Sequence, residues 1–86
     1  MKEIKHIKWH DSYGVSAGWE DVSDFKANEL IIHSIGFVLH EDDKVISLTG
    51  NYASETDKTV EQANGIITIP KCCIEEIISV SLSISD

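Results

Sequence analysis

The side chains that usually carry out catalysis are present in this chain, but their spacing matches no common catalytic or metal-binding motif. The histidines form no helical His-x-x-x-His pair, and the cysteines form no Cys-x-x-Cys pair. No nucleophile-elbow motif places a serine beside a base. We therefore expect no metal site, no cofactor and no enzymatic activity. The histidines, which fall on predicted strands, are His6, His10, His33 and His40.

The two cysteines, Cys72 and Cys73, are adjacent. A disulfide prefers Cα atoms about 5.5 Å apart, whereas neighbours across a trans peptide are about 3.8 Å apart. Because a bridge between them would be strained, we expect reduced thiols in a reducing compartment. The first residues lack the apolar segment of a secretory signal, and no apolar run approaches the roughly 20 residues of a membrane span. A cytoplasmic protein without a membrane partner is the expectation.

Aromatic residues near the start of the chain are better candidates for a binding site. Trp9, Tyr13 and Trp19 lie beside small and polar residues that include Ser12. This mixture could stack a nucleobase and offer exposed backbone amides. Core packing is the alternative for both tryptophans, whereas Tyr13 falls on a predicted turn.

Lys71 is the lysine that we expect to contact a ligand, because Pro70 fixes the backbone before it. A helical turn that follows it could offer free N–H groups to an anion. A solvated lysine beside Glu75 and Glu76 is the alternative. The predicted ligand-binding residues are Trp9, Ser12, Tyr13, Trp19, Tyr52 and Lys71.

The charge balance limits the partners that this chain can bind. Fifteen Asp and Glu residues face seven Lys and no Arg, which gives a net charge of -8. An extended nucleic acid would be repelled, and the guanidinium groups that bind phosphate and guanine are absent. A small phosphorylated ligand remains compatible, because one or two lysines and backbone amides can hold it. The acidic turn 41–43 lacks the spacing of a calcium loop and is expected to be a solvated hairpin tip.

The pattern of apolar residues predicts one mainly β domain over residues 1–86. Alternation places Ile7 and Trp9 on one face of the first strand and His6, Lys8 and His10 on the other. Gly36 marks the expected bend of the longest strand. The strands are predicted at 4–10, 29–41, 45–49, 66–69 and 76–82.

Short connecting segments separate these strands. One helical turn is predicted within 20–28, with Val22 and Phe25 facing inward, and a tight turn at 72–74. Residues 50–63 are predicted to form a long polar loop that carries Tyr52. In the last strand, Ile78, Val80 and Leu82 share a face.

Segments 36–48 and 65–77 resemble the two halves of an Sm-like barrel. The resemblance implies a small, five-stranded, strongly bent antiparallel barrel with one short helical turn. Sm-like proteins assemble into rings by pairing edge strands, so a homo-oligomer is implied. RNA-binding members carry an arginine that this chain lacks. A narrower resemblance, to small uncharacterised proteins of phages and prophages, is carried by Trp9-His10-Asp11-Ser12, Gly18-Trp19 and Ile69-Pro70-Lys71.

Two functions are compatible with these observations. The first is a non-catalytic, phage-type binding protein in the host cytoplasm. It would hold a small, nucleotide-derived ligand in pockets between subunits, and sequestering a host defence signal is one role for such a protein. The second is an acidic interaction module that binds a host or phage protein. We favour the first, because the carboxylates are spread along the chain and not gathered in a dense stripe.

Overall fold

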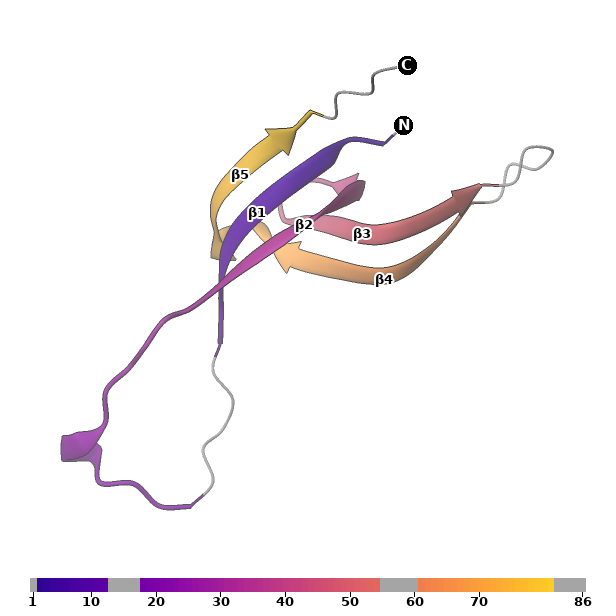
Figure 1. Cartoon of the computed structure of the whole chain (residues 1–86). Coiled ribbons are helices and arrows are strands. Elements are labelled where there is room, and N and C mark those ends of the chain that lie inside the picture. Colours follow the sequence, from indigo (N-terminus) through magenta and orange to yellow (C-terminus); the bar gives the residue numbers. More distant parts are fainter. Residues whose placement is uncertain (1, 13–17, 55–60, 82–86) are drawn as a thin grey trace.

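Five antiparallel strands form one sheet (Figure 1). The structure, a computed structural model, describes residues 2–12, 18–54 and 61–81. Two 3-10 turns accompany the strands: η1 at Val22–Asp24 and η2 at Lys71–Cys73. The strands are β1 at Ile4–Asp11, β2 at Leu30–Glu41, β3 at Val45–Ser54, β4 at Glu61–Pro70 and β5 at Ile74–Val80.

The order of the strands in the sheet is β4-β3-β2-β1-β5, and every neighbouring pair is antiparallel. This confirms the predicted mainly β class, with five antiparallel strands and very little helix. The sheet is not closed into a barrel, because β4 and β5 are its two edges and no ladder joins them in the described part of the chain. Both edges therefore present unpaired backbone groups.

One face of the sheet carries a small hydrophobic core. Four side chains are fully buried there, and they come from β1, β3 and β4; they are Ile7, Ile46, Leu48 and Ile69. Partly buried neighbours complete the cluster; they are Trp9, Val38, Ile74 and Ile77. The predicted alternation in β1 is confirmed, because Ile7 and Trp9 contribute to this core.

Strand β2 joins the two halves of the sheet and changes its partner near Gly36. Its first half, up to Phe37, pairs with β1, and its second half pairs with β3. A Cβ atom on Gly36 would lie 2.7 Å from the carbonyl oxygen of Thr49. Glycine is required here because the backbone of β3 approaches too closely for any side chain.

The predicted polar loop at 50–63 is wrong, because most of it is strand. Pairing continues from Asn51 opposite Asn64 to Ser54 opposite Glu61. The Thr49 hydroxyl donates toward the carbonyls of Asn51 and Asn64, at 2.8 and 2.7 Å. These bonds hold the ladder together across a stretch of residues that usually form turns. The remaining connection, 55–60, lies outside the described residues.

The last strand begins earlier than predicted, and it packs on the core through Ile74 and Ile77. The tight turn is at Lys71–Cys73, and β5 starts at Ile74. Ile77 lies opposite Ile7 and packs on the core, whereas Ile78 lies opposite His6 and is exposed. A register shift between Lys8 and Trp9 pairs Trp9 with Ile74, so Ile74 and Ile77, three residues apart, both pack on the core.

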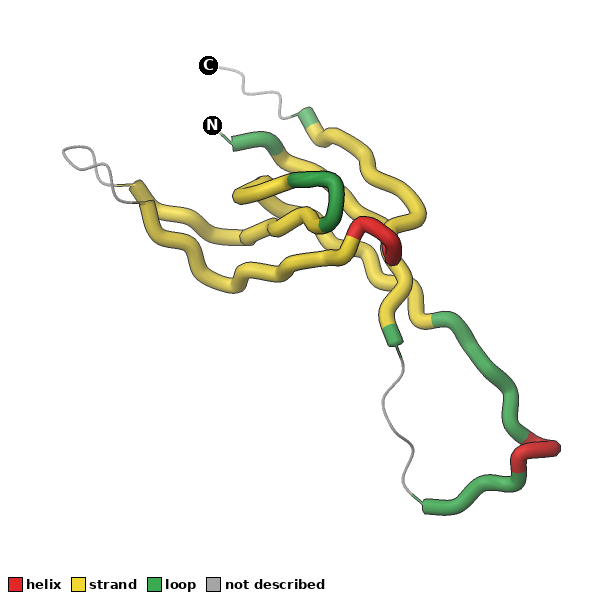
Figure 2. The backbone as a smooth tube through the Cα atoms, turned by 180° about the vertical axis from the view of Figure 1, so that it is seen from behind, coloured by secondary structure: helices red, strands yellow, loops and turns green. Residues whose placement is uncertain are grey.

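A long excursion between β1 and β2 projects away from the sheet (Figures 1 and 2). We call its described part, residues 18–29, the arm. The predicted helical turn is confirmed as η1, but its apolar residues do not face inward: Val22 is 89% exposed and Phe25 is 62% exposed. The arm gives the molecule extents of 61 × 27 × 25 Å and a radius of gyration of 17.8 Å. A compact domain of this length would have a radius of about 12 Å. None of the helices in the described residues has the length and apolar character needed to cross a membrane.

Candidate functional site

The two predicted tryptophans have opposite surroundings. Trp9 packs against the core, and its indole Nε1 donates a hydrogen bond to Ser34 Oγ at 3.0 Å. Trp19, on the arm, is 103% exposed. Core packing therefore explains Trp9, whereas the indole of Trp19 is free to contact another molecule.

The residues predicted beside them are less informative. Ser12 is exposed, and its backbone N–H donates to Asp11 Oδ1 at 2.8 Å. Tyr13 lies outside the described residues. Of the predicted aromatic segment 9–19, the structure describes residues 9–12 and 18–19.

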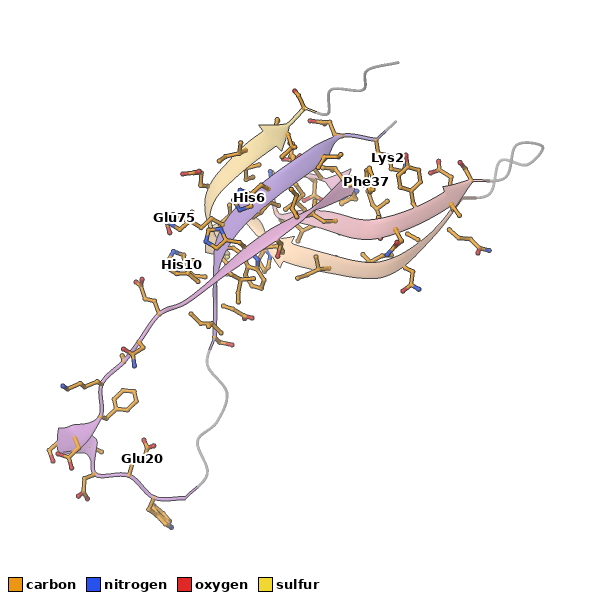
Figure 3. All side chains as sticks on the ribbon, viewed as in Figure 1. Lys2, His6, His10, Glu20, Phe37 and Glu75 are labelled. Carbon is orange, nitrogen blue, oxygen red and sulfur yellow. The ribbon has the colours of Figure 1, made fainter. Side chains whose placement is uncertain are left out.

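Tyr52 lies on β3 and not on a loop. Its ring meets Phe37 edge to face, with ring centroids 4.9 Å apart, and Lys2 Nζ lies 5.4 Å from its centroid. Figure 3 shows Lys2 and Phe37 near the β3–β4 hairpin, which points away from the arm. Tyr52 and Trp19 of one chain therefore lie too far apart to line the same binding site.

Lys71 is tied into an ion-pair cluster. Its Nζ lies 2.6 Å from Glu41 Oε2, and Lys5 Nζ lies 2.7 Å from Glu41 Oε1. The hydrogen bonds from Lys5 and then Lys71 lower the pKa of the Glu41 carboxyl below its usual value. The backbone N–H of Lys71 donates to the Lys44 carbonyl at 2.8 Å. Both donor groups of Lys71 thus have partners, and an anion would compete with Glu41 for the ammonium group.

The structure brings together a second set of polar side chains on the sheet face opposite the core. Residues directly opposite each other in an antiparallel ladder project from the same face. One row across β2, β1 and β5 is Ile35, His6 and Ile78. Continuing the same ladders gives two further rows of exposed or partly exposed side chains. We call this surface the outer face; its further members are Lys8, His10, Ile31, His33, Glu75 and Glu76.

Hydrogen bonds organise the outer face. His6 Nε2 lies 3.0 Å from His33 Nδ1, and the two rings stack with centroids 5.1 Å apart. Glu75 accepts from His10 Nε2 at 3.0 Å and lies 3.4 Å from Lys8 Nζ (Figure 3). The charge of Lys8 is the main reason that the pKa of Glu75 is lowered. This face therefore combines imidazole donors and acceptors with an ionised Glu75 that is paired with Lys8, and with a second carboxylate, Glu76, opposite Lys8.

Sequence reasoning placed His6, Lys8 and His10 on one face of the first strand but did not identify this surface. The alternation of exposed residues at Ile31, His33 and Ile35 in β2 was the available signal. Only the pairing of β2 and β5 with β1 brings the two patterns together.

The cysteines lie in η2, the turn that contacts β1 before β5 begins. Their Sγ atoms are 3.9 Å apart, and both thiols are free. The hydrogen bond with Cys72 is the main reason that the pKa of Cys73 is raised, which favours the neutral thiol. In the described ranges, no three His, Cys, Asp or Glu side chains are grouped so that they could hold a metal ion.

Two surfaces carry side chains suited to binding another molecule: the arm and the outer face. Their aromatic, imidazole and apolar groups suit binding through stacking, hydrogen bonds and apolar contact. Comparison of the chain with models of protein families, with curated proteins and with solved structures finds no match.

Proposed function

We propose that the chain is a non-catalytic binding protein that works as a homo-oligomer and holds a small, nucleotide-derived ligand between its subunits. One observation carries this proposal. Among the described residues, eight large hydrophobic side chains are exposed, whereas four hydrophobic side chains are fully buried. A monomer rarely leaves so much apolar surface in water, and such surface marks sites of association.

The edges of the sheet support assembly. Ile66 and Ile67 are exposed on edge strand β4, and Ile78 is exposed on edge strand β5. Apolar edges with unpaired backbone groups are templates for strand addition. We propose that β4 of one copy pairs with β5 of the next, which would complete the bent sheet as in an Sm-like ring.

The ligand is proposed from charge and from aromatic exposure. A net charge of -8 opposes long polyanions. A fully exposed indole such as Trp19 stacks on a flat base, and stacking contributes about 1 to 3 kcal/mol per base. The resemblance to phage proteins suggests the role, which is to sequester a nucleotide signal of the host defence.

A thermal-shift screen with linear and cyclic nucleotides tests the ligand class. A ligand at 100 times its Kd should stabilise the protein by about 2.7 kcal/mol. Absence of a shift with every nucleotide would contradict the proposed ligand.

Lys71→Ala tests the contribution of the predicted anion site. Lys5 still contacts Glu41 in this variant, so the fold should persist. We expect weaker binding of a phosphorylated ligand and unchanged binding in Lys44→Ala, a matched loss of one positive charge near the same turn. Equal affinities of the two variants for the phosphorylated ligand would show that Lys71 is not part of the binding site.

A protein partner is the second candidate, and the arm favours it. Glu20, Asp21 and Asp24 flank exposed Trp19 and Phe25, and aromatic anchors with a charged rim are typical of protein interfaces. A host protein that copurifies at fixed stoichiometry, and is lost in Trp19→Ser, would support this candidate if no nucleotide binds.

A further inference from the structure

The arm carries the two most exposed large apolar side chains of the described chain, Trp19 and Val22. Trp19, Val22 and Phe25 follow one another at intervals of three positions along the arm, and all three are exposed. Backbone hydrogen bonds from Asp24 to Asp21, at 3.0 Å, and from Phe25 to Val22, at 3.2 Å, fold the tip into a turn. The tip thus presents a set of large apolar groups without packing them on its own sheet.

The outer face carries the second group of unpacked apolar side chains. Ile35 is 63% exposed, and Ile31 and Ile78 are also exposed. Ile35 and Ile78 flank the His6 ring in one row, so apolar surface alternates with imidazole across three strands. The buried core lies on the other side of the sheet and does not need these residues.

We propose that the arm of one chain packs on the outer face of a second copy, and that the two chains exchange arms reciprocally. The proposal rests on the homo-oligomer in the proposed function and names one of its interfaces. Every copy carries one arm and one outer face, so a twofold pair covers both surfaces at once. The arm projects beyond the end of its own sheet in both views (Figures 1 and 2).

The two surfaces carry both carboxylates and hydrogen-bond donors. The arm tip contributes the carboxylates of Glu20, Asp21 and Asp24. The outer face contributes the ammonium group of Lys8 and the imidazole N–H groups. Its own carboxylates are Glu75, which is bonded to Lys8 and His10, and Glu76, which lies opposite Lys8 in the ladder.

The two stacked imidazoles are the donors of this face that suit the acidic tip best. His6 lies in the row with Ile35, and His33 lies in the next row, opposite Lys8. Their mutual hydrogen bond uses His6 Nε2 and His33 Nδ1, which leaves the other nitrogen of each ring for a further partner. An arm carboxylate can accept a hydrogen bond from an imidazole there while Trp19 or Phe25 covers the isoleucines. The contact therefore places apolar groups on apolar groups and acceptors on donors.

Mixing two defective variants tests the exchange. Trp19→Ser/Phe25→Ser removes the arm contacts and leaves the outer face intact, whereas Ile35→Lys does the reverse. Each variant alone should associate about tenfold or more weakly than the wild type in sedimentation equilibrium. A 1:1 mixture should regain part of the association, because one of the two contacts in a mixed pair then joins an intact arm to an intact face. No regain on mixing would overturn the exchange.

Ile66→Ser separates this contact from pairing of the sheet edges. It removes an exposed isoleucine of β4 that lies outside both surfaces. If Ile66→Ser dissociates the oligomer while the arm and face variants do not, the homo-oligomer stands and arm exchange fails. If the wild type is a monomer at high concentration, the homo-oligomer fails as well.

Zero-length carbodiimide cross-linking identifies the contact directly. In an equal mixture of ¹⁴N- and ¹⁵N-labelled protein, a link from Lys8 to Glu20, Asp21 or Asp24 should join light and heavy peptides. The Lys8–Glu75 pair, 3.4 Å apart within one chain, is the internal control, and its cross-link should join two peptides with the same isotope label. Arm links that never mix isotopes would mean that the arm folds onto its own face, which contradicts the proposal.

Discussion

At the scale of the residue, the environment and not the residue type decides what each aromatic side chain does. Trp9 is held by a hydrogen bond and by the core, while Trp19 has water around its whole ring. The same amphipathic indole serves stability in one case and is available for recognition in the other. Loss of the Trp9–Ser34 hydrogen bond should therefore change the stability of the fold and not recognition.

We expect Ser34→Ala to destabilise the fold by about 1 kcal/mol. The substitution leaves a partly buried indole N–H without its partner, and the loss of such a partner costs about 1 to 3 kcal/mol when water cannot replace it. Urea denaturation measures the difference. Ser47→Ala is the matched control, because Ser47 bonds Thr68 at an exposed position and should change stability by less than about 0.5 kcal/mol. Equal losses in the two variants would contradict the role of the Trp9 bond.

Asp42 predicts a local dependence on pH. His40 and the backbone N–H groups of Lys44 and Val45 donate to its carboxylate and lower its pKa from 3.8 to about 2. Because the folded pKa is depressed, the stabilisation of the turn is present above pH 3.8 and is lost as the pH falls through about 2. An NMR titration of the Asp42 carboxyl carbon should show a midpoint near 2.

Removal of His40 provides the control for this titration. Its hydrogen bond is the largest cause of the shift, so His40→Ala should move the Asp42 midpoint upward. A midpoint near 3.8 in the wild-type protein would show that the turn does not form as described.

At the scale of the element, the point where β2 changes partner is the most sensitive place in the sheet. Gly36→Ala would put a Cβ atom 2.7 Å from the Thr49 carbonyl oxygen and 3.3 Å from Leu48 Cβ. Because the nearest atom belongs to the backbone, relief requires the strands to move, and we expect a loss of about 1 to 3 kcal/mol in thermal or urea unfolding. Gly50→Ala meets no atom within 4 Å and should be nearly neutral. A neutral Gly36→Ala would mean that β2 and β3 are further apart.

The strands were predictable where alternation is regular and not where pairing overrides local preference. The first strand was expected at 4–10 and is Ile4–Asp11. The outer half of the β3–β4 hairpin, 50–54 and 61–65, was missed because its glycines and asparagines favour turns, while the cross-strand ladder and the Thr49 hydroxyl keep them extended. The outer face was missed because its histidines meet only through the order of strands, which sequence alternation does not contain.

At the scale of the whole molecule, the chain has more apolar surface than one copy can cover. The core is limited to one side of an open sheet, and the arm, the outer face and the β4 edge each leave large side chains in water. Ile78 belongs both to the β5 edge and to the outer face, whereas Ile66 and Ile67 belong to the β4 edge alone and the arm residues to the arm–face contact alone. The variants of the arm, the outer face and Ile66 remove these contacts one at a time, and their effects on association would show which contact forms first.

Trp19 provides a measure of assembly that does not depend on a mutation of the interface. With Trp9→Phe, Trp19 is the remaining tryptophan and reports on the arm alone. In dilute protein its fully exposed ring should be quenched freely by acrylamide. As concentration rises, arm docking should bury the ring, lower the quenching and shift the emission to the blue. The complementary variant Trp19→Phe leaves Trp9, whose core position should make its quenching independent of concentration. Quenching of Trp19 that stays constant while sedimentation shows assembly would mean that the chains associate through their sheet edges and leave the arm in water.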